Sequence, residues 1–205
     1  KVSKRGSKKS RASINDFRFV VYYNFLKQNP SIKNVFCTDV SDININCNFF
    51  KLLKSNVIYC GEIPKYNVIG KCGCNITKSG NVKHPKGNFI SCSLNKTEVY
   101  KAFLPITYID NIKKYSNNKL LAAGIFGGSY NISLHVLKEI SKNLYIINAR
   151  RNINMFIFNY VIYKLSDEFN YEMISGYPVH NDFGVKNVNK NINLEKDFWI
   201  VHRNI

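Results

Sequence analysis

The chain has 205 residues, of which 45% are hydrophobic and 14% aromatic, and 30 Lys and Arg against 13 Asp and Glu give it a net charge of +17. This composition can bury a full core, so it excludes a disordered protein and favours a single domain. No apolar run approaches the roughly 18 residues of a membrane span, and the excess positive charge favours polyanions such as nucleic acid, acidic membrane surfaces or phosphorylated small molecules.

Residues 1–13 form a basic arm, because six of the first eleven residues are Lys or Arg and no acid precedes Asp16. One interpretation is a solvated, mobile segment. The other is a basic loop that closes over a phosphate ligand, with Lys4, Arg5, Lys8 and Lys9 screening the phosphate charge. Residues 14–205 are expected to form the folded domain.

The first predicted helix follows this arm. Ser13 and Asp16 have the spacing of a capping box, and Pro30 ends the pattern. The apolar residues of this segment fall roughly on one helical stripe: Phe17, Val20, Val21 and Phe25. Residues 34–38, NVFCT, then have the character of a buried strand, and residues 56–62, NVIYCGE, form a second one.

The middle of the chain is irregular in pattern. Residues 61–100 are rich in Gly, Lys, Asn and Cys and show little periodicity, which indicates an irregular excursion. Residues 119–129, KLLAAGIFGGS, predict a strand or a short turn-bearing element that runs into a glycine pair. Residues 130–144 then predict a helix whose inner side carries Leu134, Leu137 and Ile140.

The last third of the chain contains one strongly amphipathic segment. Within residues 153–165, apolar side chains recur at helical spacing: Phe158, Val161, Ile162 and Leu165. Residues 171–176, YEMISG, and residues 197–202, DFWIVH, predict two late, short strands. The order of helix, strand, strand, helix, helix, strand and strand indicates an α/β domain.

Two acids lie where the first strand ends. Asp39 and Asp42 follow NVFCT on a predicted turn, and ligands collect at the carboxyl ends of strands in open α/β sheets. Carboxylates at this spacing can hold one divalent cation, which can then bridge to a diphosphate. The alternative is that Asp39 caps the turn while Asp42 is solvated.

Two further stretches carry site chemistry. Gly127, Gly128 and Ser129 precede a predicted helix, whose first N–H groups can bind an anion or a sugar hydroxyl, although a turn with an ordinary Ser cap explains them equally well. His202 and Arg203 end a late apolar strand and suit a metal–phosphate site. We expect this strand to join the sheet of residues 34–38 and to place His202 beside the two acids.

The order of these motifs resembles the nucleotide-sugar glycosyltransferases of the GT-A type. The resemblance spans roughly residues 14–203 and begins with a helix carrying DFRF (16–19). It continues with TDVSD (38–42), a D-x-x-D variant of the DXD motif, and the aromatic pair Phe49-Phe50. AAGIFGGS (122–129), FNY (158–160), G-x-P-V (176–179) and a terminal His-Arg complete the pattern.

The resemblance implies a single GT-A-like domain with a central mixed sheet flanked by helices, the first strand of the pattern lying upstream of residue 1. It implies that Asp39, Asp42 and His202 hold Mn²⁺ or Mg²⁺ and that Arg18 binds the nucleotide. The same pattern assigns Gly127, Gly128 and Ser129 to the sugar or acceptor pocket.

Asn154 stands where the family pattern commonly has an Asp, so it would hydrogen-bond a sugar and not act as a base. Asp42 and Asn154 are therefore the candidate catalytic residues.

The expected function is transfer of a sugar from a UDP- or GDP-sugar to a glycan, protein or small-molecule acceptor with divalent-metal help. Two alternatives remain: a basic nucleic-acid-binding protein that uses its 13 Tyr and 14 Phe for stacking, and a catalytically silent relative of the enzymes. No specific nucleic acid is expected, because no recognisable RNA- or DNA-binding motif occurs. The cellular compartment stays open between the cytoplasm and, with an upstream anchor, the secretory pathway.

Overall fold

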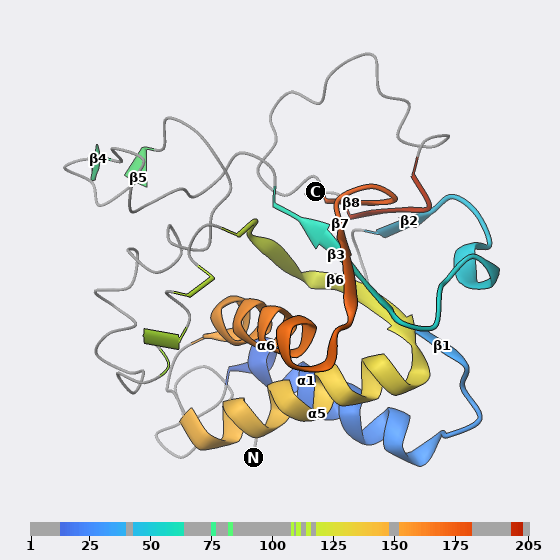
Figure 1. Cartoon of the computed structure of the whole chain (residues 1–205), viewed down its shortest axis with the longest axis horizontal. Helices are drawn as coiled ribbons and strands as arrows, with labels where there is room; N and C mark the ends of the chain where they lie inside the picture. The colour runs from blue at the N-terminus through green and yellow to red at the C-terminus, as the bar shows by residue number, and fades with distance from the viewer. Residues whose placement is uncertain are drawn as a thin grey trace.

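The computed structural model describes residues 13–39, 43–63, 75–76, 82–83, 108, 110–111, 114–115, 118–147, 152–181 and 198–202. The basic arm before residue 13 and most of the irregular excursion lie outside these residues. The three long helices of the described part are α1 (Ile14–Gln28), α5 (Tyr130–Ile147) and α6 (Asn154–Phe169). They gather on one side of the strands (Figure 1).

The strands form two mixed sheets and a separate two-stranded pair. The four-stranded sheet has the order β1 (Asn34–Thr38), β6 (Leu121–Ser129), β3 (Val57–Glu62), β7 (Glu172–Ser175). The three-stranded sheet has the order β2 (Ile43–Ile45), β9 (Ile200–His202), β8 (Val179–Asn181). The short pair is β4 (Asn75–Ile76) with β5 (Val82–Lys83), and a 3₁₀ turn, η1 (Phe49–Lys51), follows β2.

The α/β class is therefore confirmed, but one central sheet was expected and two are present. Each sheet combines an antiparallel pairing with one parallel pairing, β3 with β7 and β9 with β8. No barrel closes among the described strands. The sequence pattern did not reveal the division because β2, β8 and β9 have three residues each, too few to show a period.

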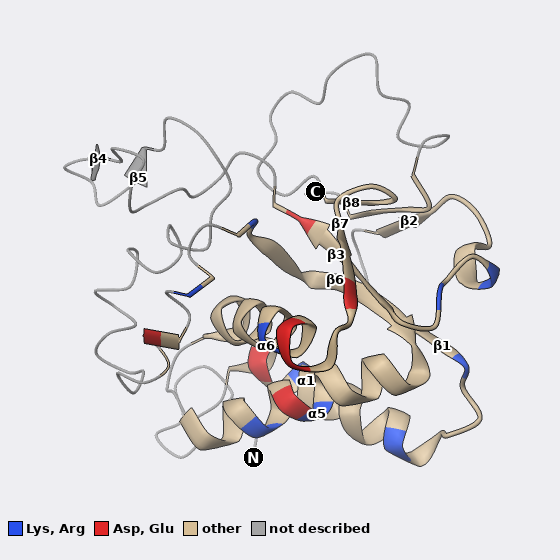
Figure 2. Cartoon of the chain, viewed as in Figure 1, with Lys and Arg blue, Asp and Glu red and all other residues tan. Residues whose placement is uncertain are grey.

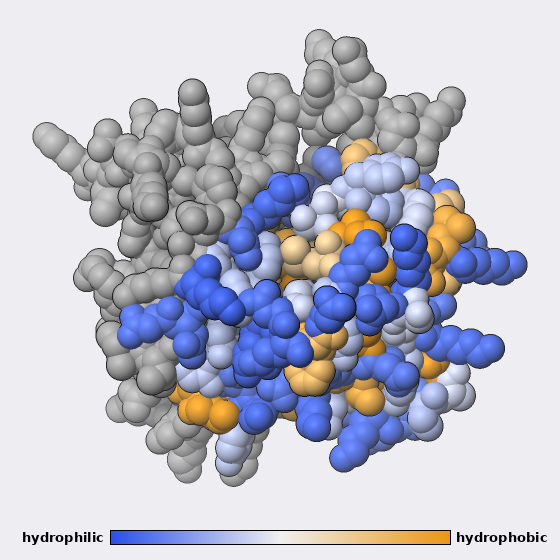
Figure 3. Space-filling model, in the orientation of Figure 1, coloured by the Kyte–Doolittle hydropathy of each residue, from blue (hydrophilic) through white to orange (hydrophobic). Residues whose placement is uncertain are grey.

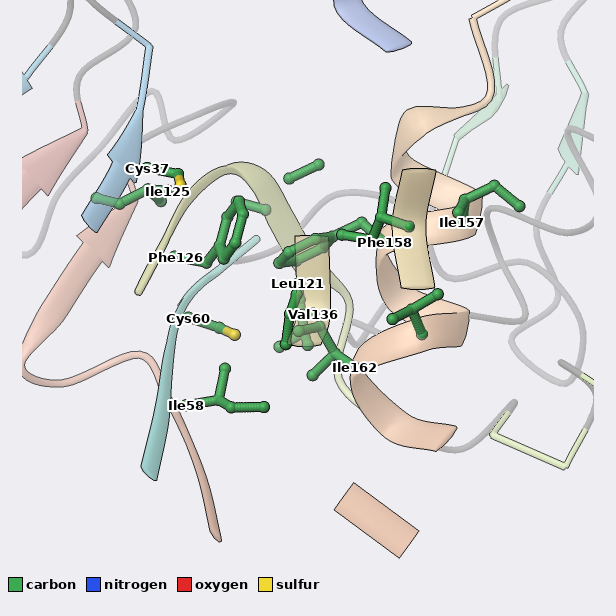
Figure 4. Packing of buried hydrophobic residues seen from close by; sticks show 14 of the residues in the cluster. Cys37, Ile58, Cys60, Leu121, Ile125, Phe126, Val136, Ile157, Phe158 and Ile162 are labelled. Carbon is green, nitrogen blue, oxygen red and sulfur yellow. The ribbon is translucent and has the colours of Figure 1, made fainter. Parts of the chain in front are cut away.

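The core packs between β6 and the helices. Phe126 of β6 meets Phe158 of α6 (Figure 4) with ring centroids 4.9 Å apart. Phe19 of α1 stacks on both rings. All three rings are almost fully buried, and each contributes about 1.5–3 kcal/mol of transfer free energy. The predicted helix is confirmed and its four expected inward residues are buried: Phe158, Val161, Ile162 and Leu165. It is not amphipathic over residues 156–163, however, because every one of them is buried.

A second, aromatic layer covers the other face of β6. The Phe49 ring contacts those of Phe36 and Trp199 at centroid distances of 5.1 and 5.9 Å, and Trp199 contacts Tyr59 at 5.7 Å. Phe36 and Tyr59 both pair with Gly127 across the sheet. A side chain at Gly127 would enter this layer, since a Cβ there would lie 2.4 Å from the Phe36 ring and 2.3 Å from the carbonyl oxygen of Val35.

Helix α1 begins as predicted but turns a different face inward. The Ser13 side chain accepts a hydrogen bond of 3.0 Å from the Asp16 N–H, which confirms the cap. Val21 and Phe25, expected on one apolar stripe, are exposed, whereas Phe19 and Leu26 are buried. Apolar residues occur on several sides of this helix, so the contacts with α5 and β6 decide which side is buried.

Asp16 joins α1 to the start of α6. Its carboxylate accepts a hydrogen bond from the Ile153 N–H at 3.1 Å, at the N-terminus of α6, where a negative charge and an acceptor are both favourable. Burial nevertheless raises the pKa of Asp16, despite hydrogen bonds from Ser13 and Ile153 that lower it. Because the pKa is higher in the folded state than in the unfolded chain, the contribution of Asp16 to stability is full at pH values below 3.8 and is lost as the pH rises through the folded-state pKa.

An Asp16→Asn variant should remove this pH dependence, because Asn still accepts the Ile153 N–H but carries no charge. We expect the free energy of unfolding of the variant to rise relative to that of wild type as the pH increases from 4 to 7, because only the wild type must bury a charge. Urea titrations at several pH values measure it. A difference that is constant, or that moves the other way, contradicts the raised pKa.

Candidate functional site

The candidate site lies where β1 ends beside the middle of β6. The Asp39 N–H donates to the carbonyl oxygen of Gly124 at 3.1 Å, which holds the acid directly against β6. Gly124 leaves room for the side chain: a Cβ there would lie 2.5 Å from Asp39 Oδ2 and 3.2 Å from His202 Cε1. A residue other than glycine at this position would displace the carboxylate.

Arg18 reaches Asp39 from α1. Its Nη1 forms an ion pair with Asp39 Oδ1, and its Nη2 donates to the carbonyl oxygen of Ala123 at 3.1 Å. The buried Nε–H of Arg18 has no hydrogen-bond partner among the described residues. The side chains of Arg18 and Asp39 are 20% and 37% exposed, so the pair lies at the surface end of the core and is accessible from one side.

His202 comes to the same point from the second sheet. Its Nε2 lies 3.7 Å from Asp39 Oδ2. The expectation that β9 joins the sheet of β1 was wrong, although His202 does lie beside Asp39. The reason is that β2, which follows β1 in the chain, pairs with β9 and places Ile43 opposite His202.

Asn181 sets the proton position on His202. The Asn181 amide nitrogen donates to the carbonyl oxygen of Glu62 at 3.2 Å, so its oxygen faces the imidazole. That oxygen lies 2.7 Å from His202 Nδ1, which must therefore carry a hydrogen and donate it. In the neutral imidazole, Nε2 then holds the lone pair, and this lone pair is on the side of Asp39 Oδ2.

Asp39 Oδ2 and His202 Nε2 lie 3.7 Å apart. A carboxylate oxygen and an imidazole nitrogen are both common metal ligands, so the two atoms can bind one cation. Two ligands each about 2.1 Å from a common ion lie at most about 4.2 Å apart, so Asp39 and His202 are close enough to share one. Among the described residues, no group of three or more His, Cys, Asp and Glu side chains is gathered for a metal. Asp42, the expected third ligand, lies outside the described residues, as does Arg203.

Of the two elements predicted for residues 119–129, the strand is the one that forms, and it includes the glycine pair. Gly127 and Gly128 are not in a turn but inside β6, where backbone atoms of β1 and β3 leave no room for a Cβ. Ser129 pairs with Asn34, at the opposite end of β1 from Asp39, and its hydroxyl donates to the carbonyl oxygen of Ser55 at 2.9 Å. The assignment of all three to a sugar pocket stays a prediction.

Asn154 begins α6 and is buried, with 6% of its surface exposed. Its backbone N–H donates to the side-chain oxygen of Asn152 at 3.1 Å. The next residue is closer to the site, because the Met155 sulfur accepts from the Ala123 N–H at 3.4 Å, beside the carbonyl that Arg18 binds. The start of α6 and the Asp39 cluster therefore contact neighbouring residues of β6, Ala123 and Gly124.

Sequence reasoning missed Asn181 and Gly124 as members of this site. Gly124 begins the GIFGGS stretch, but the functional prediction was assigned to Gly127 and Gly128 in the same stretch. Asn181 follows the G-x-P-V pattern by two residues, and a single Asn among many carries no signal of its own.

A scan against protein-family models finds no match for this chain, and a search of curated proteins finds no significant match either. Within the described ranges, no helix combines the length and the apolar character that crossing a membrane requires.

Proposed function

We propose that the protein is a metal-assisted glycosyltransferase that moves a sugar from a nucleotide-diphosphate donor to an acceptor. The observation that carries this proposal is the contact between Asp39 and His202, two potential metal ligands from distant parts of the chain. Arg18 pairs with the same carboxylate. These are the residues that the GT-A resemblance assigns to the cation and the nucleotide.

In this proposal Asp39 and His202 hold Mn²⁺ or Mg²⁺, with Asp42 as a further ligand. The cation supplies charge stabilisation to the leaving diphosphate. Asn181 keeps the His202 lone pair pointed at the site by accepting the Nδ1 hydrogen. Arg18 offers a planar guanidinium suited to a phosphate group, and Asn154 hydrogen-bonds a sugar.

The direct test measures thermal stability with UDP- and GDP-sugars in the presence and absence of Mn²⁺. We expect a rise in the melting temperature that needs both the nucleotide sugar and the metal, since each ligand that binds only the folded state stabilises it. Transfer to an acceptor, or slow donor hydrolysis, should accompany binding. Metal-dependent binding with neither reaction would identify a silent relative, in keeping with Asn154 at the position of the usual acid.

The nucleic-acid alternative gains no support from the described part of the chain. Along the ribbon of Figure 2, the Lys and Arg positions of the described residues are spread over α1, α5 and the loops between strands and form no single stripe. The same face carries isolated apolar patches among hydrophilic side chains (Figure 3). Salt-sensitive retention on RNA, without metal-dependent retention on a UDP or GDP matrix, would favour this alternative over the enzyme.

An Asn181→Ala variant should weaken metal binding without removing a ligand. Loss of the acceptor frees the His202 ring to change its tautomer and orientation, and such changes around a metal ligand typically cost 10–100-fold in affinity. Asn181→Asp should retain most of the affinity, because its carboxylate also accepts the Nδ1 hydrogen. Mn²⁺ titration calorimetry measures both.

The matched control is Asn143→Ala, which removes a buried amide on α5 whose hydrogen bond within the described residues stays in its own helix, at the Glu139 carbonyl oxygen. Equal Mn²⁺ affinity in wild type and Asn181→Ala would show that Asn181 does not position His202.

A further inference from the structure

The Asp39 carboxylate is divided between two partners. Oδ1 is paired with Arg18, and Oδ2 is directed to the Nε2 side of His202. A guanidinium on one oxygen neutralises the charge that would attract a cation to the other. The site therefore holds its own positive charge at the place where the proposed function requires a metal.

We propose that Arg18 is an internal counter-ion of Asp39 that exchanges this carboxylate for a phosphate when the donor binds. The inference rests on the proposed function and adds a rule of binding order to it. Cation alone binds weakly because it competes with Arg18 for Asp39. Cation with a diphosphate binds strongly, because Arg18 then has an anion to pair with.

The environment of Arg18 supports such an exchange. The ion pair is partly shielded from water, so it competes more effectively than a fully exposed pair would. Its Nη2 is held by the Ala123 carbonyl oxygen, and the guanidinium lies 5.1 Å from the Phe19 ring centroid, which keeps it near the site.

The exchange also has a favourable direction. The buried Nε–H has no acceptor among the described residues, and an unsatisfied buried donor costs stability. Each phosphate of a nucleotide-diphosphate donor offers two non-bridging oxygens, and arginine binds such groups with two N–H donors at once. Movement from carboxylate to phosphate therefore satisfies more of the guanidinium, but only when the phosphate is present.

The experiment compares Mn²⁺ binding to wild type and Arg18→Gln, with and without inorganic pyrophosphate. We expect Arg18→Gln to bind Mn²⁺ alone about tenfold more tightly, because one charge-assisted hydrogen bond no longer competes. With Mn²⁺ saturating, it should bind pyrophosphate about tenfold more weakly. Association of Mn²⁺ with pyrophosphate in solution is the same for both proteins, so it cancels in the comparison.

Lys119→Gln is the matched control, since it removes an equal charge from another surface ion pair, with Glu62, and should leave both affinities near wild type. Arg18→Lys is the second variant if Arg18→Gln fails to fold: the ratio of Mn²⁺ affinities with and without pyrophosphate should be smaller than in wild type. A ratio equal to wild type overturns the inference.

The results separate this inference from the proposed function. Suppose that Asp39→Asn abolishes Mn²⁺ binding, while Arg18→Gln leaves the Mn²⁺ affinity unchanged or weakens it. This result would refute the exchange and keep the metal site. If the Mn²⁺ affinity is the same in wild type, Asp39→Asn, His202→Ala and Arg18→Gln, both the exchange and the metal site are refuted.

Discussion

An Asp39→Asn variant should lose metal-dependent donor binding and with it nearly all transfer activity. The amide keeps the size of the side chain but removes the negative charge that both a cation and Arg18 require. We expect activity to fall on the order of 10²–10³-fold, the scale seen when one electrostatic stabiliser of a transition state is removed. Transfer assays across a Mn²⁺ series, together with thermal shifts, measure the loss.

The control for this variant is Asp167→Asn, which removes a surface carboxylate that pairs with Lys114 at 2.7 Å. It should behave as wild type, because exposed ion pairs contribute little. An Asp39→Asn protein that folds and still transfers sugar at the wild-type rate would remove the central residue of the proposed site.

A Gly127→Ala variant should cost about 1–3 kcal/mol of unfolding free energy, the scale of overpacking in a tight core. The added Cβ would lie 2.3 Å from the backbone oxygen of Val35, which cannot move without shifting β1, and 2.4 Å from the Phe36 ring. Urea denaturation measures the loss. Because β1 leads directly to Asp39, metal affinity should fall with stability.

Ser129→Ala on the same strand is the comparison, since it removes only the hydroxyl bond to the Ser55 carbonyl oxygen and should cost about 1 kcal/mol or less. If Gly127→Ala is as stable as wild type but no longer binds the donor, the glycine belongs to the sugar pocket that the family resemblance assigns to it.

Local patterns in the sequence were sufficient for the main elements. The Ser13–Asp16 cap, the strand before Asp39 and the helix α6 all depend on residues within one or two turns of each other. Such signals survive in a single sequence because capping, strand burial and helical periodicity are short-range effects. They also placed Asp39 at the end of β1, where the candidate site is found.

The meeting of Arg18, Asp39 and His202 was decided by the tertiary structure. It needs α1 to turn Arg18 toward β6, and it needs β2 to carry the chain from the first sheet to β9 in the second. Neither step leaves a local pattern: α1 is apolar on several sides, and the strands of the second sheet are three residues long. The same holds for Gly127. Only glycine fits at this position because Val35 and Phe36 of the neighbouring strand occupy the space of a Cβ, and the sequence pattern around Gly127 does not reveal those contacts.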